Sequence, residues 1–111
     1  MSDDQNQAQR AVFDTERTVT APFTGSFQTI GSALTHNPVI IIFDNQSTVA
    51  VAISVDGTNT WKTFTSGEAL VLDMRGNKGI APNFTIDKGT QFYGLGTAGT
   101  GLFSIAIIYA K

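Results

Sequence analysis

The stretch that most constrains the fold runs from Pro38 to Gly57, with the sequence PVIIIFDNQSTVAVAISVDG. Its first part, Val39–Phe43, is a short apolar run of mainly β-branched residues, which favours a strand over a helix. In its second part, bulky residues at positions 49, 51, 53 and 55 alternate with small ones, the period of a strand whose two faces differ. We therefore expect a hairpin of two adjacent strands, with the bulky face in the core and the small face open to close approach by another layer.

Short apolar segments of the same kind continue along the chain, separated by turn signals such as Ser66-Gly67. The pair Asp56-Gly57 predicts a tight hairpin in which Gly57 has a positive φ. About eight short strands are expected at a spacing of roughly ten residues, and no segment keeps a helical period. The last strand, Leu102–Tyr109, repeats the contrast between a bulky and a small face, so we expect it beside the Pro38–Gly57 hairpin in one sheet. The pattern predicts an all-β antiparallel sandwich, jelly-roll-like, formed by residues 17–111 as a single domain.

The first 16 residues, MSDDQNQAQRAVFDTE, differ from this domain. They show no strand alternation and begin with a polar tract, which predicts a flexible, extended N-terminal arm. Inside the arm, Ala11-Val12-Phe13 is a small apolar patch. Two interpretations of the patch stay open: it packs on the rim of its own domain, or it anchors the arm on a neighbouring subunit.

Charged residues are scarce, at 14% of the chain against about 25% in ordinary soluble domains. A polar but weakly charged surface suits a protein packed among neighbours, because each buried charge would need a partner. The alternative is a neutral, Thr-rich β-surface with no such role. A net charge of −2 does not indicate a nucleic-acid partner. No apolar run approaches the roughly 20 residues of a membrane helix, so no membrane partner is expected.

No combination of residue types indicates catalysis or metal binding. His36, the single histidine, lacks the adjacent nucleophile and orienting carboxylate that a catalytic triad needs. The chain has no Cys, which excludes thiolate metal sites. The letters GLGTAG at 94–99 match a dinucleotide fingerprint, but an apolar strand follows them where a helix is required.

Four carboxylates stand at expected strand ends or turns, where Asp commonly accepts bonds from nearby backbone N–H groups: Asp44, Asp56, Asp73 and Asp87. Their spacing does not match a calcium loop. We predict a protein that is not an enzyme, with no catalytic, cofactor-binding or metal-binding residues and no cofactor.

The order of four segments is distinctive: ISVDGTNTW at 53–61, GEALVLDMRGN at 67–77, IDKGTQFY at 86–93 and GLFSIAIIYAK at 101–111. This order, over about residues 38–111, resembles the small β-sandwich structural proteins of tailed-bacteriophage virions. The resemblance implies a virion protein assembled in the host cytoplasm, most directly a capsid cement or decoration protein that binds coat subunits and stabilises the head. Its partners would be the major capsid protein or other virion proteins, and it would form a homo-oligomer. No functional residues carry over, because such proteins have interfaces in place of active sites.

Two alternatives remain open. The first keeps the chain in the virion as a neck or tail accessory protein or a fibre base. The second is a carbohydrate-binding β-sandwich module that uses Trp61 and Tyr93, because aromatic rings stack on sugars. For the virion interpretation the candidate interface residues come from the arm and from two loops: Gln5, Arg10, Val12, Phe13, Arg75, Lys78, Leu95 and Thr97.

Overall fold

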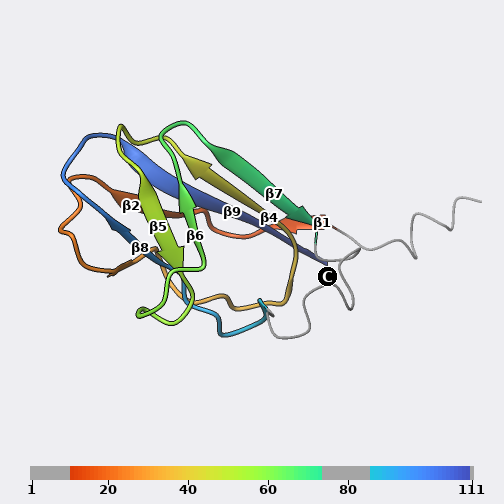
Figure 1. The fold of residues 1–111 in the computed structure, drawn as a ribbon. Helices are drawn as coiled ribbons and strands as arrows, with labels where there is room; N and C mark the ends of the chain where they lie inside the picture. Colours follow the sequence, from red (N-terminus) through yellow and green to blue (C-terminus); the bar gives the residue numbers. More distant parts are fainter. Residues whose placement is uncertain (1–10, 74–85, 111) are drawn as a thin grey trace, which may run out of the picture.

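The structure, a computed structural model, describes residues 11–73 and 86–110, and every regular element in these two ranges is a strand. In chain order the described strands are β1 (Ala11–Phe13), β2 (Arg17–Thr20), β3 (Gln28–Thr29), β4 (Pro38–Asn45), β5 (Val51–Ser54), β6 (Lys62–Phe64), β7 (Ala69–Asp73), β8 (Tyr93–Gly96) and β9 (Leu102–Ala110). Sheet A has the order β1-β9-β4-β7, with β2 also paired to β9, and sheet B has the order β3-β8-β5-β6. Figure 1 shows β4, β7 and β9 in one layer and β5, β6 and β8 in the other. The predicted all-β antiparallel sandwich is confirmed.

The strand pairing is that of a jelly roll. β1 and β2 lie end to end along one edge of β9, on residues 108–110 and 102–105 respectively. Counted as one strand, they give eight strands in which the first pairs with the last, the second with the seventh, the third with the sixth and the fourth with the fifth. An antiparallel ribbon rolled into two sheets produces this pattern, and every pairing in it is antiparallel.

The expected hairpin between β4 and β5 is wrong. β4 lies in sheet A between β9 and β7, whereas β5 lies in sheet B between β8 and β6. The turn after Asn45 therefore crosses from one sheet to the other. β9 does lie beside the Pro38–Gly57 stretch as expected, because it pairs with β4. The side-chain alternation specifies which face of a strand is buried, but it does not specify which strand lies next to it.

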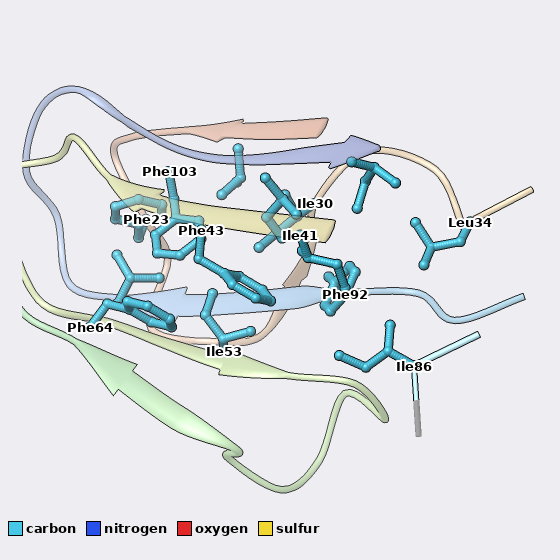
Figure 2. Packing of buried hydrophobic residues seen from close by; sticks show 14 residues of the cluster. Phe23, Ile30, Leu34, Ile41, Phe43, Ile53, Phe64, Ile86, Phe92 and Phe103 are labelled. Carbon is cyan, nitrogen blue, oxygen red and sulfur yellow. The ribbon is translucent and has the colours of Figure 1, made fainter. Parts of the chain in front are cut away.

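The core lies between the two sheets and is built from the bulky faces that the alternation predicted. Val51 and Ile53 of β5 and Phe103 and Ile105 of β9 are fully buried. At the centre, the Phe43 ring lies 5.6 Å from the ring of Phe92 in an edge-on contact (Figure 2). Each fully buried side chain of this size contributes about 1.5–3 kcal/mol. The cluster also contains Val19, Phe23, Ile30, Leu34, Ile41, Phe64, Ile86 and Ile107.

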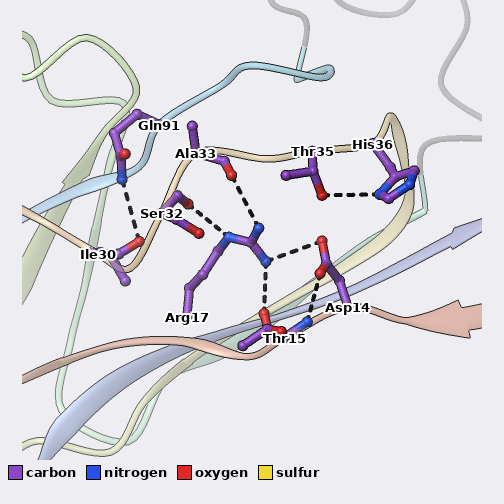
Figure 3. A network of polar contacts seen from close by, with 9 residues as sticks. All are labelled: Asp14, Thr15, Arg17, Ile30, Ser32, Ala33, Thr35, His36 and Gln91. Atoms are coloured by element: carbon purple, nitrogen blue, oxygen red, sulfur yellow. Dashed lines mark hydrogen bonds and ion pairs between the residues drawn. The ribbon is translucent and has the colours of Figure 1, made fainter.

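A buried arginine fixes the segment between β1 and β2. Arg17 is 3% exposed, and its guanidinium donates hydrogen bonds to the carbonyl oxygens of Ser32, Thr15 and Ala33 at 2.8, 2.7 and 3.2 Å (Figure 3). It also forms an ion pair with Asp14 at 3.3 Å. These bonds join the start of β2 to the loop before β4, so the position of β1 on β9 is supported by side-chain as well as backbone contacts.

A buried amide fixes the crossing between the sheets. The Asn45 side chain donates through Nδ2 to the carbonyl oxygens of Val49, Phe64 and Thr65 at 2.9, 3.0 and 3.0 Å. Its Oδ1 accepts bonds from the backbone N–H and the hydroxyl of Ser47 at 3.0 and 2.6 Å. Asn45 thus connects the end of β4 to the start of β5 and the end of β6.

The connection between β5 and β6 is longer than the tight hairpin predicted from Asp56-Gly57. Gly57 has φ +79°, the left-handed conformation that the sequence predicted. Strand pairing resumes only at Lys62, because the Asp56 carboxylate accepts bonds from the backbone N–H groups of Thr58 and Asn59, both at 2.8 Å, and holds them in a turn. These bonds, with Asn59 the largest cause, hold the pKa of Asp56 far below its ordinary value.

Candidate interaction surface

The outward face of sheet A carries apolar side chains in register. Ile108 of β9 is paired with Phe13 on one side and with Ile40 on the other. One step along the strands, Ile42 of β4 is paired with Ala106 and with Val71 of β7. Residues paired across antiparallel strands point to the same face of a sheet. The residues next to them along β4 and β9, such as Ile41, point into the core. The paired residues named above therefore point away from the core.

We call the six residues the outer apolar face: Phe13, Ile40, Ile42, Val71, Ala106 and Ile108. Phe13 and Val71 are the two large hydrophobic side chains that are exposed in the described part of the chain, at 78% and 59%. The isoleucines of the face are half-buried by their neighbours. No described element covers the face. An antiparallel sheet with one solvated side normally carries polar residues there, so a contiguous apolar face indicates an interaction site.

The next row along the strands is small and polar, and consists of Thr18, Ser104, Asp44 and Ala69. Asp44 lies at the border of the outer apolar face and accepts a hydrogen bond from Gln46 at 2.9 Å. Asp73 lies at another corner, in the row of Ile108 and Ile40. Within the described residues, the centre of the face therefore has no charge and the charges at its border are carboxylates.

The structure separates the candidate interface residues that it describes. Val12 and Phe13 lie in β1, where Val12 points inward opposite Tyr109 and Phe13 points outward on the outer apolar face. Leu95 lies in β8 on the outward side of sheet B, opposite Ala52, and Thr97 follows it in an exposed loop. That loop enters the start of β9, whereas Phe13 pairs near its end, so the two sets lie at opposite ends of β9. Gln5, Arg10, Arg75 and Lys78 lie outside the described residues.

Five members of the outer apolar face were not among the candidates predicted from the sequence: Ile40, Ile42, Val71, Ala106 and Ile108. One signal was available in the apolar run Val39–Phe43. A continuous run without alternation is typical of a strand with apolar contacts on both of its faces. A second signal was Ile108, the one bulky residue on the small face of the last strand.

The aromatic pair needed for carbohydrate binding does not share a face. The Trp61 ring packs against Phe43 and Phe64, with centroid distances of 5.3 and 6.4 Å, on the inner side of the sandwich. Tyr93 is paired with Ser54 and Thr29 on the outward side of sheet B. The two side chains therefore do not form a common platform for a sugar ring.

Several titratable groups of the described residues make structural contacts. The imidazole of His36 stacks on Tyr109, with ring centroids 3.8 Å apart and planes 2° from parallel. Glu68 accepts a bond from the backbone N–H of Thr65 at 2.9 Å and pairs with Lys62 at 3.0 Å, and these contacts lower its pKa. Residues 11–73 and 86–110 contain no group of three or more His, Cys, Asp or Glu residues that could hold a metal ion. The same residues include no helix of the length and apolarity that crossing a membrane requires.

Comparison of the chain with family models, with curated proteins and with solved structures found no match. The function is therefore argued from the fold, from the outer apolar face and from the sequence resemblance.

Proposed function

We propose that the protein is a non-enzymatic structural component of a phage virion, most directly a capsid cement or decoration protein that binds coat subunits. The observation that carries this proposal is the outer apolar face, because a contiguous apolar surface on a sandwich is suited to packing against protein. The jelly-roll pairing supports it, since this fold recurs in viral capsid and lectin domains. The order of the segments at 53–61, 67–77, 86–93 and 101–111 supports the phage assignment.

The scarcity of charge suits this role. A protein that is packed between neighbours buries part of its surface, and each buried charge without a partner costs free energy. Of the three Lys and Arg residues that the structure describes, Arg17 and Lys62 are already paired, with Asp14 and Glu68. A cement protein stabilises the particle because it binds the assembled state and not the dispersed subunits. At a free concentration 100 times its dissociation constant, this linkage contributes about 2.7 kcal/mol per site.

Within this proposal, the end of sheet A that carries β1 contacts the coat. Phe13 is the most exposed large apolar side chain of the described residues. Its strand is held on β9 by three residue pairs, and the ion pair of Arg17 with Asp14 fixes the chain just after it. Phe13 is thus an apolar group on a supported strand, which limits the conformational entropy lost on binding.

Addition of the purified protein to heads assembled without it tests the proposal. We expect saturable binding and a rise in the temperature at which the heads release their DNA. Burial of a Phe side chain contributes about 1.5–3 kcal/mol, so Phe13→Ser should weaken binding roughly tenfold or more. Thr97→Ala, at the opposite end of β9, is the matched control and should bind as the parent protein does. Heads that neither bind the protein nor gain thermal resistance would contradict the proposal.

A further inference from the structure

We propose that an extended segment of a coat subunit pairs with the free edge of β7 and lengthens sheet A by one strand. The contact rests on the proposed function and specifies how the coat is bound. β7 stands at the end of the order β1-β9-β4-β7, so it pairs with β4 on one side only (Figure 1). No strand within residues 11–73 and 86–110 pairs with its other side.

The hydrogen bonds to β4 define which backbone groups of β7 face the free edge. The backbone N–H of Asn45 donates to the carbonyl oxygen of Glu68 at 2.9 Å, just before β7 begins. In an antiparallel pair of strands, hydrogen-bonded and non-hydrogen-bonded residue pairs alternate. Leu70, two residues further along, is therefore bonded to β4. Ala69 and Val71 direct their backbone N–H and C=O groups away from β4.

The other side of β4 agrees with this assignment. The backbone N–H of Gln46 donates to the carbonyl oxygen of Leu102 at 2.9 Å, so the even-numbered residues of β4 bond to β9 and the odd-numbered ones to β7. Ala69 and Val71 are both paired with even-numbered residues of β4. Both are also exposed, Val71 at 59%. Their backbone groups are therefore accessible to a further strand.

β7 lacks the features by which β-proteins protect an edge. Edge strands are commonly very short or carry Lys, Pro or a β-bulge, because unpaired backbone groups otherwise pair with another chain. β7 has five residues, ALVLD, and its register with β4 has no shift. The edge strands of sheet B, β3 and β6, have two and three residues, and β6 carries Lys62. The opposite edge of sheet A is divided between β1 and β2, with three and four residues. Among the described edges, β7 is therefore the one most suited to strand addition.

The edge fits an extended polypeptide with apolar side chains on both of its faces. In strand addition, main-chain hydrogen bonds give affinity and alternate side chains give specificity. The side chain opposite Val71 continues the outer apolar face, because paired residues point to the same face of a sheet. The residues on either side of it lie next to Leu70 and Leu72, which pack against the core. An apolar, β-branched segment of the coat therefore fits this edge.

Binding to heads assembled without the protein tests the contact. Ala69→Pro removes an N–H that is directed to the free edge, and Pro is tolerated at the first residue of an edge strand. This variant should bind heads roughly tenfold or more weakly than the parent protein, because it loses a main-chain bond and its ring blocks a further strand. Ala69→Ser keeps the N–H and is the matched comparison, which should bind several-fold more tightly than Ala69→Pro.

Hydrogen exchange of the parent protein gives an independent measurement. In the free protein the amides of Ala69 and Val71 should exchange rapidly, since no strand bonds them. On the heads they should exchange roughly tenfold or more slowly, because pairing with the coat segment protects them. The amide of Thr97, at the opposite end of β9, is the control and should not change. Circular dichroism checks that Ala69→Pro folds, and the exchange measurement decides the question if it does not.

Several results would overturn the contact. Equal binding by Ala69→Pro and the parent protein, or equal losses from Ala69→Pro and Ala69→Ser, would exclude main-chain pairing and leave the virion role intact. Unchanged exchange of Ala69 and Val71 on heads that bind the protein would do the same. A dimer of the purified chain that Ala69→Pro dissociates would assign the edge to a second copy. Absence of all binding to heads would instead contradict the proposed function, and the coat segment with it.

Discussion

Replacement of Asn45 by Asp tests how the two sheets are joined. The Asn45 side chain is fully buried, and its Nδ2 donates to three backbone carbonyl oxygens within 3.0 Å. Aspartate has nearly the same shape but, when ionised, has no hydrogen to donate. Asn45→Asp therefore leaves three carbonyl groups without this donor and places a carboxylate oxygen against them.

The expected loss of stability follows from these contacts. Each buried carbonyl group that loses its hydrogen-bond donor costs about 1–3 kcal/mol, and the variant affects three of them. Because backbone movement and water satisfy part of the site, we expect a total loss of about 4 kcal/mol. Domains of this kind have free energies of unfolding of about 5–15 kcal/mol. With an unfolding entropy of about 2.1 cal/mol/K per residue, the 111-residue chain should melt roughly 15 °C lower.

The same variant should show a defined pH dependence. Burial and the facing carbonyl oxygens raise the pKa of the introduced carboxyl in the folded state. A raised pKa means that the penalty is complete at neutral pH and diminishes as the pH falls through that pKa, because the protonated acid can again donate one hydrogen bond. The difference from the parent protein should therefore narrow in mild acid.

Urea unfolding followed by circular dichroism measures both effects, at neutral pH and at about pH 5. Ser47→Ala is the matched control: it removes the hydroxyl that donates to Asn45 Oδ1 at 2.6 Å and should cost only about 1 kcal/mol. A loss below 1 kcal/mol for Asn45→Asp at neutral pH, or a loss that does not change with pH, would refute the role assigned to Asn45.

Three further predictions concern stability. Arg17→Lys should lower the free energy of unfolding in urea by about 2–3 kcal/mol, because an ammonium group cannot donate to all three carbonyl oxygens that the guanidinium reaches. Substitutions at the surface change this free energy by about ±0.5 kcal/mol, so a loss no larger than that would contradict the prediction. The pKa of Asp56 is lowered in the folded state, so the ionised carboxylate stabilises the fold fully above its ordinary pKa of 3.8, and this stabilisation is lost as the pH falls through the lowered pKa. The loss of stability caused by Asp56→Ala should therefore become smaller in strong acid. A loss that is the same at every pH would exclude the charge effect. Ile53→Asp should abolish the cooperative thermal transition and Ala52→Ser should not, and a cooperatively melting Ile53→Asp protein would contradict the core assignment.

The sequence predicted most of the strands and their buried faces, because these depend on local alternation, but it did not predict β1, which lies in the expected arm. β4 and β9 begin and end within a residue or two of their expected positions, and Ile53 and Ile105 are buried as expected. The pairing of strands depends on contacts between distant segments. The crossing after Asn45 is directed by carbonyl groups at positions 64 and 65, which no pattern within the stretch Pro38–Gly57 contains.

The candidate surface was predicted only in part for the same reason. Phe13 was a candidate because it is apolar within a polar segment. Val71 was not, because its exposure follows from the pairing of β7 with β4 and from the inward orientation of Leu70 and Leu72. No pattern in the local sequence marks Arg17 as a buried residue. Its burial requires the loop at 31–33, including Gly31, where a Cβ atom would come within 2.5 Å of Arg17 Cγ.

The most direct test of the proposed role is the number of copies of the chain in purified virions, measured by quantitative mass spectrometry on separated heads and tails. A cement or decoration protein follows the symmetry of the capsid, so we predict on the order of hundreds of copies in the head fraction. A dozen or fewer copies in the tail fraction would favour the neck or tail alternative. Absence of the chain from the particles would contradict the structural role.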